Sequence, residues 1–277
     1  MLRDELLCTP HELSGLIKTG RVSVLDCRFD LMDPQRGQTA YLDAHIPGAA
    51  YVHLDHELSA PVAPQTGRHP LPEPAVAAAM FESKGIRSGS PVVIYDDANN
   101  AIAARAWWML RWLGHRHVRL LDGGFAAWRA QGFALEAGAA AIHAGEFTGS
   151  AAENRVATVD ELEKGLRGAL VDARAKVRFD GRSEPIDPVA GHIPGAHNLP
   201  LDLALDGNMR FLPKEQVARL WVDTVGDEAD VTVMCGSGVT ACHLIVSALL
   251  AGRAEPRLYA GSWSEWIRKI DRPIARN

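Results

Sequence analysis

The chain is poor in cysteine: its 277 residues include four, Cys8, Cys27, Cys235 and Cys242. Four thiols are too few for a disulfide scaffold in a chain of this length, and a reducing compartment would keep them as thiols. No apolar run approaches the roughly 20 residues that a membrane-spanning helix needs. The opening stretch MLRDELLCTPHEL also lacks the basic region and apolar core of a signal peptide. These absences predict a cytoplasmic protein that does not enter a membrane.

The chain also lacks a strong excess of charge of either sign. Lys and Arg number 29 against 34 Asp and Glu, a formal net charge of −5, and no basic cluster marks a surface for nucleic acid or anionic lipid. The remaining composition, 47% hydrophobic and 23% charged, is that of a globular protein. The length allows two ordinary domains or one large one. Composition therefore excludes nucleic-acid and membrane partners without selecting a function.

An internal repeat decides between one domain and two. Four segments of the first half recur in the same order in the second: VLDCR (24–28) as LVDAR (170–174), HIPG (45–48) as HIPG (192–195), VVIYD (92–96) as VTVMC (231–235), and GGFAAW (123–128) as GSWSEW (261–266). The repeating unit is a whole domain and not a short solenoid repeat. We expect two homologous domains, at 1–138 and 155–277, joined by a linker at 139–154.

The first half is longer than the second in one place. Asp96 lies 51 positions after His45 in the first half, whereas Cys235 lies 43 positions after His192 in the second. The additional residues fall in SAPVAPQTGRHPLPEP (59–74), which is rich in Pro and Gly and has no apolar period. Long ordered loops in compact domains are often functional, and we expect this one to reach the other domain.

Short apolar runs alternate with helical patterns in both halves. The first half contains predicted strands at 21–28, 90–96 and 116–124 and predicted helices at 73–85 and 100–114. The second half contains predicted strands at 168–174, 230–236 and 255–261 around a predicted helix at 239–252. Such alternation predicts an α/β fold: two doubly wound domains, each with a mainly parallel sheet covered by helices on both faces.

The strongest chemical signal is Cys235, at the end of a predicted buried strand. Gly236, Ser237 and Gly238 follow it, and then an amphipathic helix begins. The carboxyl ends of strands in an open α/β sheet are where ligands bind. Glycines allow a tight turn whose amide N–H groups, with the helix N-terminus, can point at the sulfur, lower the thiol pKa and stabilise an anion there. The alternative is an inert buried cysteine beside a glycine turn.

Over essentially its whole length, the chain resembles the tandem-domain rhodanese-like sulfurtransferases. The motifs that carry the resemblance are the loop CGSGVT (235–240), HIPG in both halves, DAR (172–174) and the terminal GSWSEW. CGSGVT is similar to the loop of the 3-mercaptopyruvate branch, whereas thiosulfate-preferring relatives typically carry two basic residues after the cysteine. The resemblance implies that Cys235 accepts a sulfane sulfur as a persulfide, held by the amides of the loop residues Gly236, Ser237, Gly238, Val239 and Thr240. The sulfur then passes to cyanide or a thiol acceptor, for example a thioredoxin-like reductant.

Binding of a 3-mercaptopyruvate donor requires a cation that grips a carboxylate, which favours arginine. By the resemblance, Arg178 matches the substrate-binding arginine of the family. A second family arginine usually lies in an EPRDG-like stretch, but this chain reads EPIDP and has Ile186 there. Either Arg182 replaces it or the donor range is broader. For Arg174 a structural ion pair with Asp172 is the favoured interpretation.

The mercaptopyruvate branch is also proposed to use a Ser–His–Asp relay, and the matching positions are Ser237, His69 and Asp55. His69 lies in the long loop of the first half, so the relay would explain the additional length of that loop. A serine two residues beyond the nucleophile would lie near the donor carbonyl, where a histidine could hold or move its proton. The alternative is that His69 is a surface residue and that Ser237 only donates to the sulfur.

The other candidate residues are expected to be structural. Asp96 stands where Cys235 stands in the second half, and its loop has no thiol and no glycine pair, so the first domain should be catalytically silent. Cys8, Cys27 and Cys242 fall in apolar or terminal segments without such a turn, and we expect core roles for Cys27 and Cys242. His45, His192, Trp128, Trp263 and Trp266 lie in motifs present in both halves. No CxxC or paired His/Cys spacing predicts a metal, and no cofactor is expected.

Three other functions remain as alternatives to this interpretation. Thiosulfate is the second candidate donor, although its double negative charge would favour cations within the loop. A cysteine phosphatase needs an arginine six residues after the nucleophile, where this chain has Ala241. A non-enzymatic sulfur-carrying or regulatory module would keep the persulfide without small-molecule turnover.

Overall fold

The computed structural model describes residues 1–277, which form two compact units. Unit 1 consists of 1–60, 72–152 and 207–211, and unit 2 of 61–71, 153–206 and 212–277. Where the sequence predicts a linker over 139–154, the chain as far as Ala152 packs on unit 1. Its main-chain contacts there include Gly145 N–H with the Glu82 carbonyl at 2.8 Å and Ala152 N–H with the Trp112 carbonyl at 3.0 Å.

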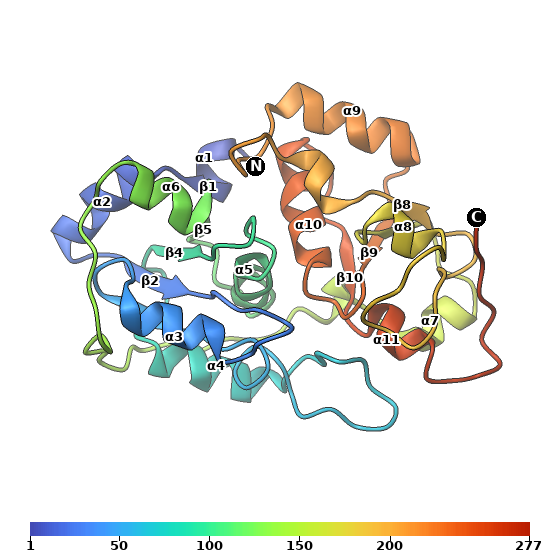
Figure 1. The fold of residues 1–277 in the computed structure, drawn as a ribbon, viewed down its shortest axis with the longest axis horizontal. Coiled ribbons are helices and arrows are strands. Elements are labelled where there is room, and N and C mark those ends of the chain that lie inside the picture. The colour runs from blue at the N-terminus through green and yellow to red at the C-terminus, as the bar shows by residue number, and fades with distance from the viewer. The chain divides into compact units, whose positions relative to one another are not determined.

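Unit 1 is a five-stranded parallel sheet in the order β1-β5-β4-β2-β3 (Figure 1). Its strands are β1 (Leu7–Cys8), β2 (Ser23–Asp26), β3 (Ala49–Tyr51), β4 (Val92–Tyr95) and β5 (Val118–Leu121). Its helices are α1 (Arg3–Leu6), α2 (Pro10–Thr19), α3 (Arg36–Asp43), α4 (Pro74–Ser83), α5 (Ala103–Trp112) and α6 (Gly124–Ala130). Strands β2, β4 and β5 and helices α4 and α5 coincide with predicted elements.

Unit 2 repeats this order as β6-β10-β9-β7-β8, again with every pair parallel. Its strands are β6 (Val156–Ala157), β7 (Ala169–Asp172), β8 (His197–Asn198), β9 (Val231–Met234) and β10 (Arg257–Tyr259). Its helices are α7 (Val159–Glu163), α8 (Lys176–Phe179), α9 (Lys214–Val225), α10 (Ala241–Leu250) and α11 (Ser262–Trp266). Helices α9 and α10 lie side by side (Figure 1). The predicted α/β class and parallel sheets are confirmed in both units.

Each sheet buries an apolar cluster on one face. In unit 1 the side chains of Val24, Val93 and Leu121 pack with α2 and α6. In unit 2 the side chains of Leu170 and Met234 pack with α7 and α11. Alternate residues of the same strands are also buried, as expected for parallel strands covered on both faces. No helix of the structure combines the length and the apolar character that crossing a membrane requires.

The repeated motifs build the same supports in both units. Arg28 forms a buried ion pair with Asp26 at 2.6 Å and donates to the Ala44 carbonyl. Arg174 does the same with Asp172, also at 2.6 Å, and with the Gly191 carbonyl. These pairs fix the HIPG segment beside the central strands, as the structural interpretation of Arg174 predicts.

The histidines of the two HIPG motifs also match. The Nδ1 atom of His45 lies 2.8 Å from the Tyr41 carbonyl oxygen, and that of His192 lies 2.7 Å from the Phe179 carbonyl oxygen. Each ring stacks on the aromatic residue that it bonds, with centroids 4.1 and 3.7 Å apart. Identical contacts in two units support a structural task, as their recurrence in the sequence predicts.

Candidate functional site

The candidate site is the thiol loop, residues 235–240, between β9 and α10 in unit 2. Asp172 and Met234 pair across β7 and β9, so Cys235 is the first residue beyond the central strand of the sheet. Its side chain is buried. The hydroxyl of Ser262 accepts the Cys235 N–H at 3.1 Å, and the Trp263 N–H donates to the Cys235 carbonyl at 3.0 Å. Both sides of the Cys235 main chain are therefore fixed by α11.

Gly238 is required by the turn of this loop. Its φ of +76° is a left-handed conformation, and a Cβ there would lie 2.2 Å from the Ala260 carbonyl oxygen. In this conformation the Gly238 N–H donates to Sγ of Cys235 at 3.2 Å. The N–H groups of Gly236, Ser237, Val239 and Thr240 donate to no oxygen or sulfur of the chain. The loop thus binds the thiol through one amide and leaves four further main-chain donors within five residues of it, where a negatively charged atom could be received.

The structure brings His69 to this loop. His69 Nδ1 lies 2.7 Å from Ser237 Oγ, and both side chains are buried. His69 belongs to segment 61–71, which is part of unit 2 although it derives from the first half of the sequence. Asp55, the third predicted relay residue, belongs to unit 1, where its N–H donates to His53 Nδ1 at 3.1 Å. Its role in a relay stays a prediction.

Of the two predicted donor-binding arginines, only Arg178 lies at the thiol loop. A Cβ placed on Gly236 would be 3.5 Å from one terminal nitrogen of Arg178. Arg182 instead has a side chain that is 70% exposed, with its Nε 3.7 Å from Asp180. A residue that the sequence did not single out, Arg68, lies nearest to Gly236, at 3.0 Å from the same Cβ position.

The remaining thiols differ from Cys235 in their surroundings. Burial raises the pKa of Cys8 to about 11 and that of Cys27 well above its ordinary value, where two neighbouring carboxylates, Asp26 and Asp96, add to the effect. Cys242 is buried in α10 and contacts the Gly238 carbonyl at 3.5 Å. A thiol with a raised pKa is a poor nucleophile at neutral pH, so neither Cys8 nor Cys27 competes with Cys235.

Asp96 in unit 1 occupies the place that Cys235 holds in unit 2. Asp26 and Tyr95 pair across β2 and β4, and Asp96 follows directly. We call residues 96–103 the carboxylate loop. Its main-chain N–H groups at Ala98, Asn100, Ile102 and Ala103 all donate to the buried Asp96 carboxylate, at 2.8 to 2.9 Å. The equivalent loop of unit 1 therefore binds its own anion and offers no thiol.

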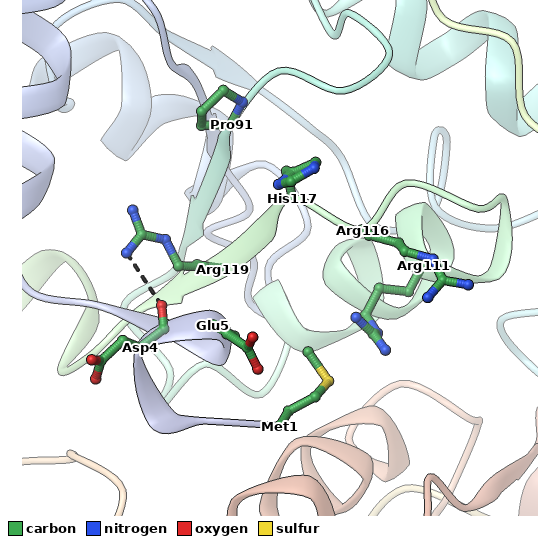
Figure 2. A pocket seen from close by; sticks show the side chains of 8 residues that line it. All are labelled: Met1, Asp4, Glu5, Pro91, Arg111, Arg116, His117 and Arg119. Carbon is green, nitrogen blue, oxygen red and sulfur yellow. Dashed lines mark hydrogen bonds between the residues drawn. The ribbon is translucent and has the colours of Figure 1, made fainter.

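Unit 1 also has a pocket lined by several basic side chains, but no cysteine or serine lines it (Figure 2). Figure 2 shows Arg119 turned to the Asp4 carbonyl oxygen, which it reaches at 3.4 Å. Charges of both signs meet here, since the lining residues are Met1, Asp4, Glu5, Pro91, Arg111, Arg116, His117 and Arg119. Nowhere do three or more His, Cys, Asp or Glu side chains converge as a metal site would require.

Comparison with known proteins agrees with this geometry. The model of the rhodanese-like domain matches twice, at residues 9–131 and 158–269, and the chain belongs to this family. It is 49% identical to the probable 3-mercaptopyruvate sulfurtransferase of Pseudomonas aeruginosa, over 97% of each chain. It is 42% identical to the putative thiosulfate sulfurtransferase SseB of Mycobacterium tuberculosis, over 99% of this chain and 98% of that one.

A solved structure shares the fold at nearly full length. SseA from Escherichia coli, described as a 3-mercaptopyruvate sulfotransferase, superposes with a TM-score of 0.81 at 28% identity, over 93% of this chain and 98% of that chain. The predicted family and the tandem arrangement of rhodanese-like domains are confirmed.

Proposed function

We propose that the chain is a sulfurtransferase that moves a sulfane sulfur from 3-mercaptopyruvate, through a persulfide on Cys235, to cyanide or a thiol. The observation that carries this proposal is the thiol loop, in which a thiol at a strand end accepts one main-chain N–H and four further N–H groups of the same loop are unpaired. Such donors stabilise an anion that forms and disappears during turnover. The sulfurtransferase names of the relatives support the same reaction.

The first half-reaction transfers one sulfur atom. The Cys235 thiolate attacks the donor sulfur, an S–S bond forms, and the C–S bond of 3-mercaptopyruvate breaks. The electron pair of that bond goes to carbon, and the resulting enolate takes up the proton of the donor thiol to give pyruvate. In the second half-reaction cyanide or a thiolate attacks the outer sulfur and restores the Cys235 thiolate. A thioredoxin-like dithiol fits as a thiol acceptor.

The Ser237–His69 pair is proposed to act at the donor ketone. Ser237 lies two residues after the nucleophile, and its hydroxyl is held 2.7 Å from His69 Nδ1. A hydroxyl so placed can donate to the carbonyl oxygen on which negative charge develops as the C–S bond breaks, while the imidazole holds or moves its proton. Asp55 is retained in this proposal as the third member of the relay.

Comparison of two donors tests the substrate. We expect kcat/KM for cyanide-dependent transfer to be at least about tenfold higher with 3-mercaptopyruvate than with thiosulfate, because the Ser237–His69 pair acts only on a carbonyl. A clear preference for thiosulfate would overturn the substrate assignment, while persulfide formation without turnover of either donor would favour a sulfur-carrying module.

Thiosulfate is the second candidate donor, and one observation favours it. Loop residues 236–240 carry no cation, but the guanidinium groups of Arg68 and Arg178 lie beside Gly236, where they could meet a dianion. The Mycobacterium tuberculosis relative is named for this donor. The same donor comparison distinguishes the two candidates.

A further inference from the structure

Three pockets of unit 1 adjoin one another at the amino ends of its central strands. The pocket of Figure 2 shares Pro91 with a second pocket beside the α2–β2 turn, and a third pocket shares His117 with the first and Gly89 with the second. Their volumes are about 470, 690 and 260 Å³. We call the three together the amino-edge groove. It lies at the opposite end of the strands from the carboxylate loop, which follows β4.

The amino-edge groove gathers positive charge in a chain whose formal net charge is −5. Two carboxylates, Asp4 and Glu5, line one end of it. The arginine and lysine side chains that line the groove are Arg21, Lys84, Arg87, Arg111, Arg116 and Arg119. No two of these are adjacent in the sequence, so the sequence alone shows no basic cluster. The fold brings them together along one edge of the sheet.

The equivalent edge of unit 2 carries the opposite charge. The turn before β4 reads RSGSP (87–91), whereas the turn before β9 reads GDEAD (226–230). In the register of the strands, His117 before β5 corresponds to Glu255 before β10. Both units have the same strand order, so the fold does not require a basic edge. The positive charge is a property of unit 1, which suggests a purpose other than holding the sheet together.

Several of the cations are available to an external anion. Arg21 and Arg116 are exposed, and neither forms a hydrogen bond or an ion pair in the chain. Arg87 lies 3.7 Å from Glu146, and the two side chains are 53% and 88% exposed. An ion pair so exposed stabilises by only about 0–1 kcal/mol, so another carboxylate can replace Glu146. Three guanidinium groups, on the turns before three neighbouring strands, can therefore meet one ligand.

An extended ligand fits this arrangement better than a compact anion. The three turns precede strands that neighbour one another in the order β5-β4-β2, and adjacent strands lie about 4.8 Å apart, so the turns span about 10 Å. About three residues of extended chain cover that length. The contact of Arg87 with Glu146 shows that a carboxylate fits here. For nucleic acid the groove lacks a stacking surface, because Phe147, the one Phe, Tyr or Trp that lines it, is buried.

We propose that the amino-edge groove binds an extended acidic segment of a partner protein. Carboxylates along that segment pair with Arg21, Arg87 and Arg116, as arginine clusters do in the recognition of acidic motifs. A cationic residue at the end of the segment meets Asp4 and Glu5, which line the same pocket as Arg116. The inference goes beyond sulfur transfer and stands whichever donor the thiol loop uses.

A second copy of the chain is a less suitable occupant, although the equivalent edge of unit 2 is acidic. The carboxylates of that edge are already bound within unit 2: Asp230 pairs with Arg167 at 2.7 Å, and Glu255 pairs with Arg155 at 2.5 Å. Association through them would first break these ion pairs. Contact between two unlike edges is also heterologous, and it would build rings or filaments rather than a closed dimer.

Binding of a labelled acidic peptide tests the proposal without any turnover. The probe is a hexapeptide of one lysine and five glutamates that carries a fluorophore, and the reference is the same labelled peptide with five glutamines. By fluorescence anisotropy of the full chain we expect a Kd below about 100 μM for the glutamate peptide in 25 mM NaCl. It should rise at least about tenfold in 250 mM NaCl, because exposed ion pairs are screened by salt. The glutamine peptide should not bind measurably.

A double variant locates the binding. Arg21→Gln with Arg116→Gln removes two exposed charges that have no partner in the chain, so the fold should keep the Tm of the wild type. We expect the Kd of the glutamate peptide to rise by about five- to 30-fold, since each exposed ion pair contributes about 0.5–1 kcal/mol. The matched control is Arg167→Gln with Arg219→Gln, which makes the same change in net charge on unit 2 and should leave the Kd within about twofold.

Four results would overturn the proposal. The first is equal Kd values in the two double variants, and the second is equal binding of the glutamine peptide. The third is a lower Kd for tripolyphosphate or for an eight-nucleotide thymidine strand than for the glutamate peptide, which would indicate a phosphate or nucleic-acid site. The fourth is self-association of the wild type in sedimentation that Arg21→Gln with Arg116→Gln abolishes, which would make a second copy the occupant. Sulfur transfer to cyanide should stay within about twofold in both double variants, so failure of the proposed function would leave the peptide result intact.

Discussion

The two sheets continue differently beyond equivalent strands. After β4 the chain continues as the carboxylate loop of eight residues, Asp96 included, and four of its amides donate to the Asp96 carboxylate. After β9 it goes on with Cys235 and a shorter turn in which a single amide, that of Gly238, donates to the sulfur. Both loops collect main-chain N–H groups at the carboxyl end of a central parallel strand, where partial positive charge gathers.

The difference shows how one duplicated fold can serve a structural and a chemical purpose. The carboxylate loop contains its own acceptor, the Asp96 side chain, so the four N–H groups that donate to it are satisfied. The thiol loop leaves the N–H groups of Gly236, Ser237, Val239 and Thr240 unpaired, which costs stability in exchange for a site that can receive an anion. In unit 1 the position equivalent to Cys235 is thus occupied by a side chain that satisfies the amides of its own loop.

The largest expected effect is on the thiol itself. Cys235→Ser should reduce sulfur transfer from either donor by at least about 10³-fold, because a hydroxyl cannot form the persulfide. Initial rates of thiocyanate formation measure this loss. Cys242→Ala, which removes a buried thiol outside the loop, should keep activity within about threefold. Substantial sulfur transfer by Cys235→Ser would show that Cys235 is not the nucleophile and that the thiol loop does not differ chemically from the carboxylate loop.

The next effect concerns His69, whose Nδ1 lies 2.7 Å from the thiol-loop hydroxyl of Ser237. His69→Ala should lower kcat/KM for 3-mercaptopyruvate by about 10²-fold, while thiosulfate-driven transfer stays within about threefold. The reason is that thiosulfate has no ketone for Ser237 and His69 to polarise. Parallel assays with the two donors measure the difference. Equal losses with both donors would indicate a structural role, and His69→Gln would then show the same pattern.

The carboxylate loop is tested through stability. Asp96→Asn replaces one acceptor oxygen by an NH₂ group that faces two main-chain N–H donors, so we expect the free energy of unfolding to fall by about 3 kcal/mol. Urea denaturation measures it. The matched control is Asp97→Asn, at an exposed neighbouring carboxylate, with an expected change within about 0.5 kcal/mol. A stability equal to the wild type would show that the amides do not depend on the Asp96 anion.

The smallest expected effect is on the pH dependence of that stability. Burial raises the pKa of Asp96 to about 6, against the opposing effect of its four amide bonds. Since this value lies above the ordinary 3.8, the contribution of the carboxyl group to stability is complete below about pH 4 and is lost as the pH rises through 6. The stability difference between wild type and Asp96→Asn should therefore be about 1 kcal/mol larger at pH 5 than at pH 7. An equal difference at both pH values would contradict this.

Much of the fold follows from local pattern in the sequence. The apolar runs of β2, β4, β7 and β9 and the helical periods of α4, α5 and α10 are long enough to predict, and the repeat assigns them to two domains. Strands β1, β6 and β8 contain two residues each, which is too short for any period to register. They form because the neighbouring strand already offers its N–H and C=O groups.

The residues of the candidate site likewise divide into those that local sequence predicts and those that it does not. Cys235 and its glycines are predictable because one turn of chain holds all of them. Arg68 is not, because its contact with Asp187 joins residues 119 positions apart and its segment has no periodic pattern. Arg182 is one of two alternatives that the sequence offers for the missing family arginine at Ile186, yet it follows the end of α8 and its side chain is largely exposed. The use of Asp96 as a built-in anion also depends on a loop conformation that includes left-handed Asn99 and Asn100.

The central claim is that one loop carries sulfur and its counterpart does not. Incubation of the wild type with 3-mercaptopyruvate in the absence of an acceptor, followed by mass spectrometry of the protein and its peptides, tests it directly. We expect a gain of one sulfur atom, confined to the peptide that contains Cys235, absent from Cys235→Ser and removed by cyanide. Sulfur on Cys8, Cys27 or Cys242 instead, or no gain at all while transfer proceeds, would contradict it.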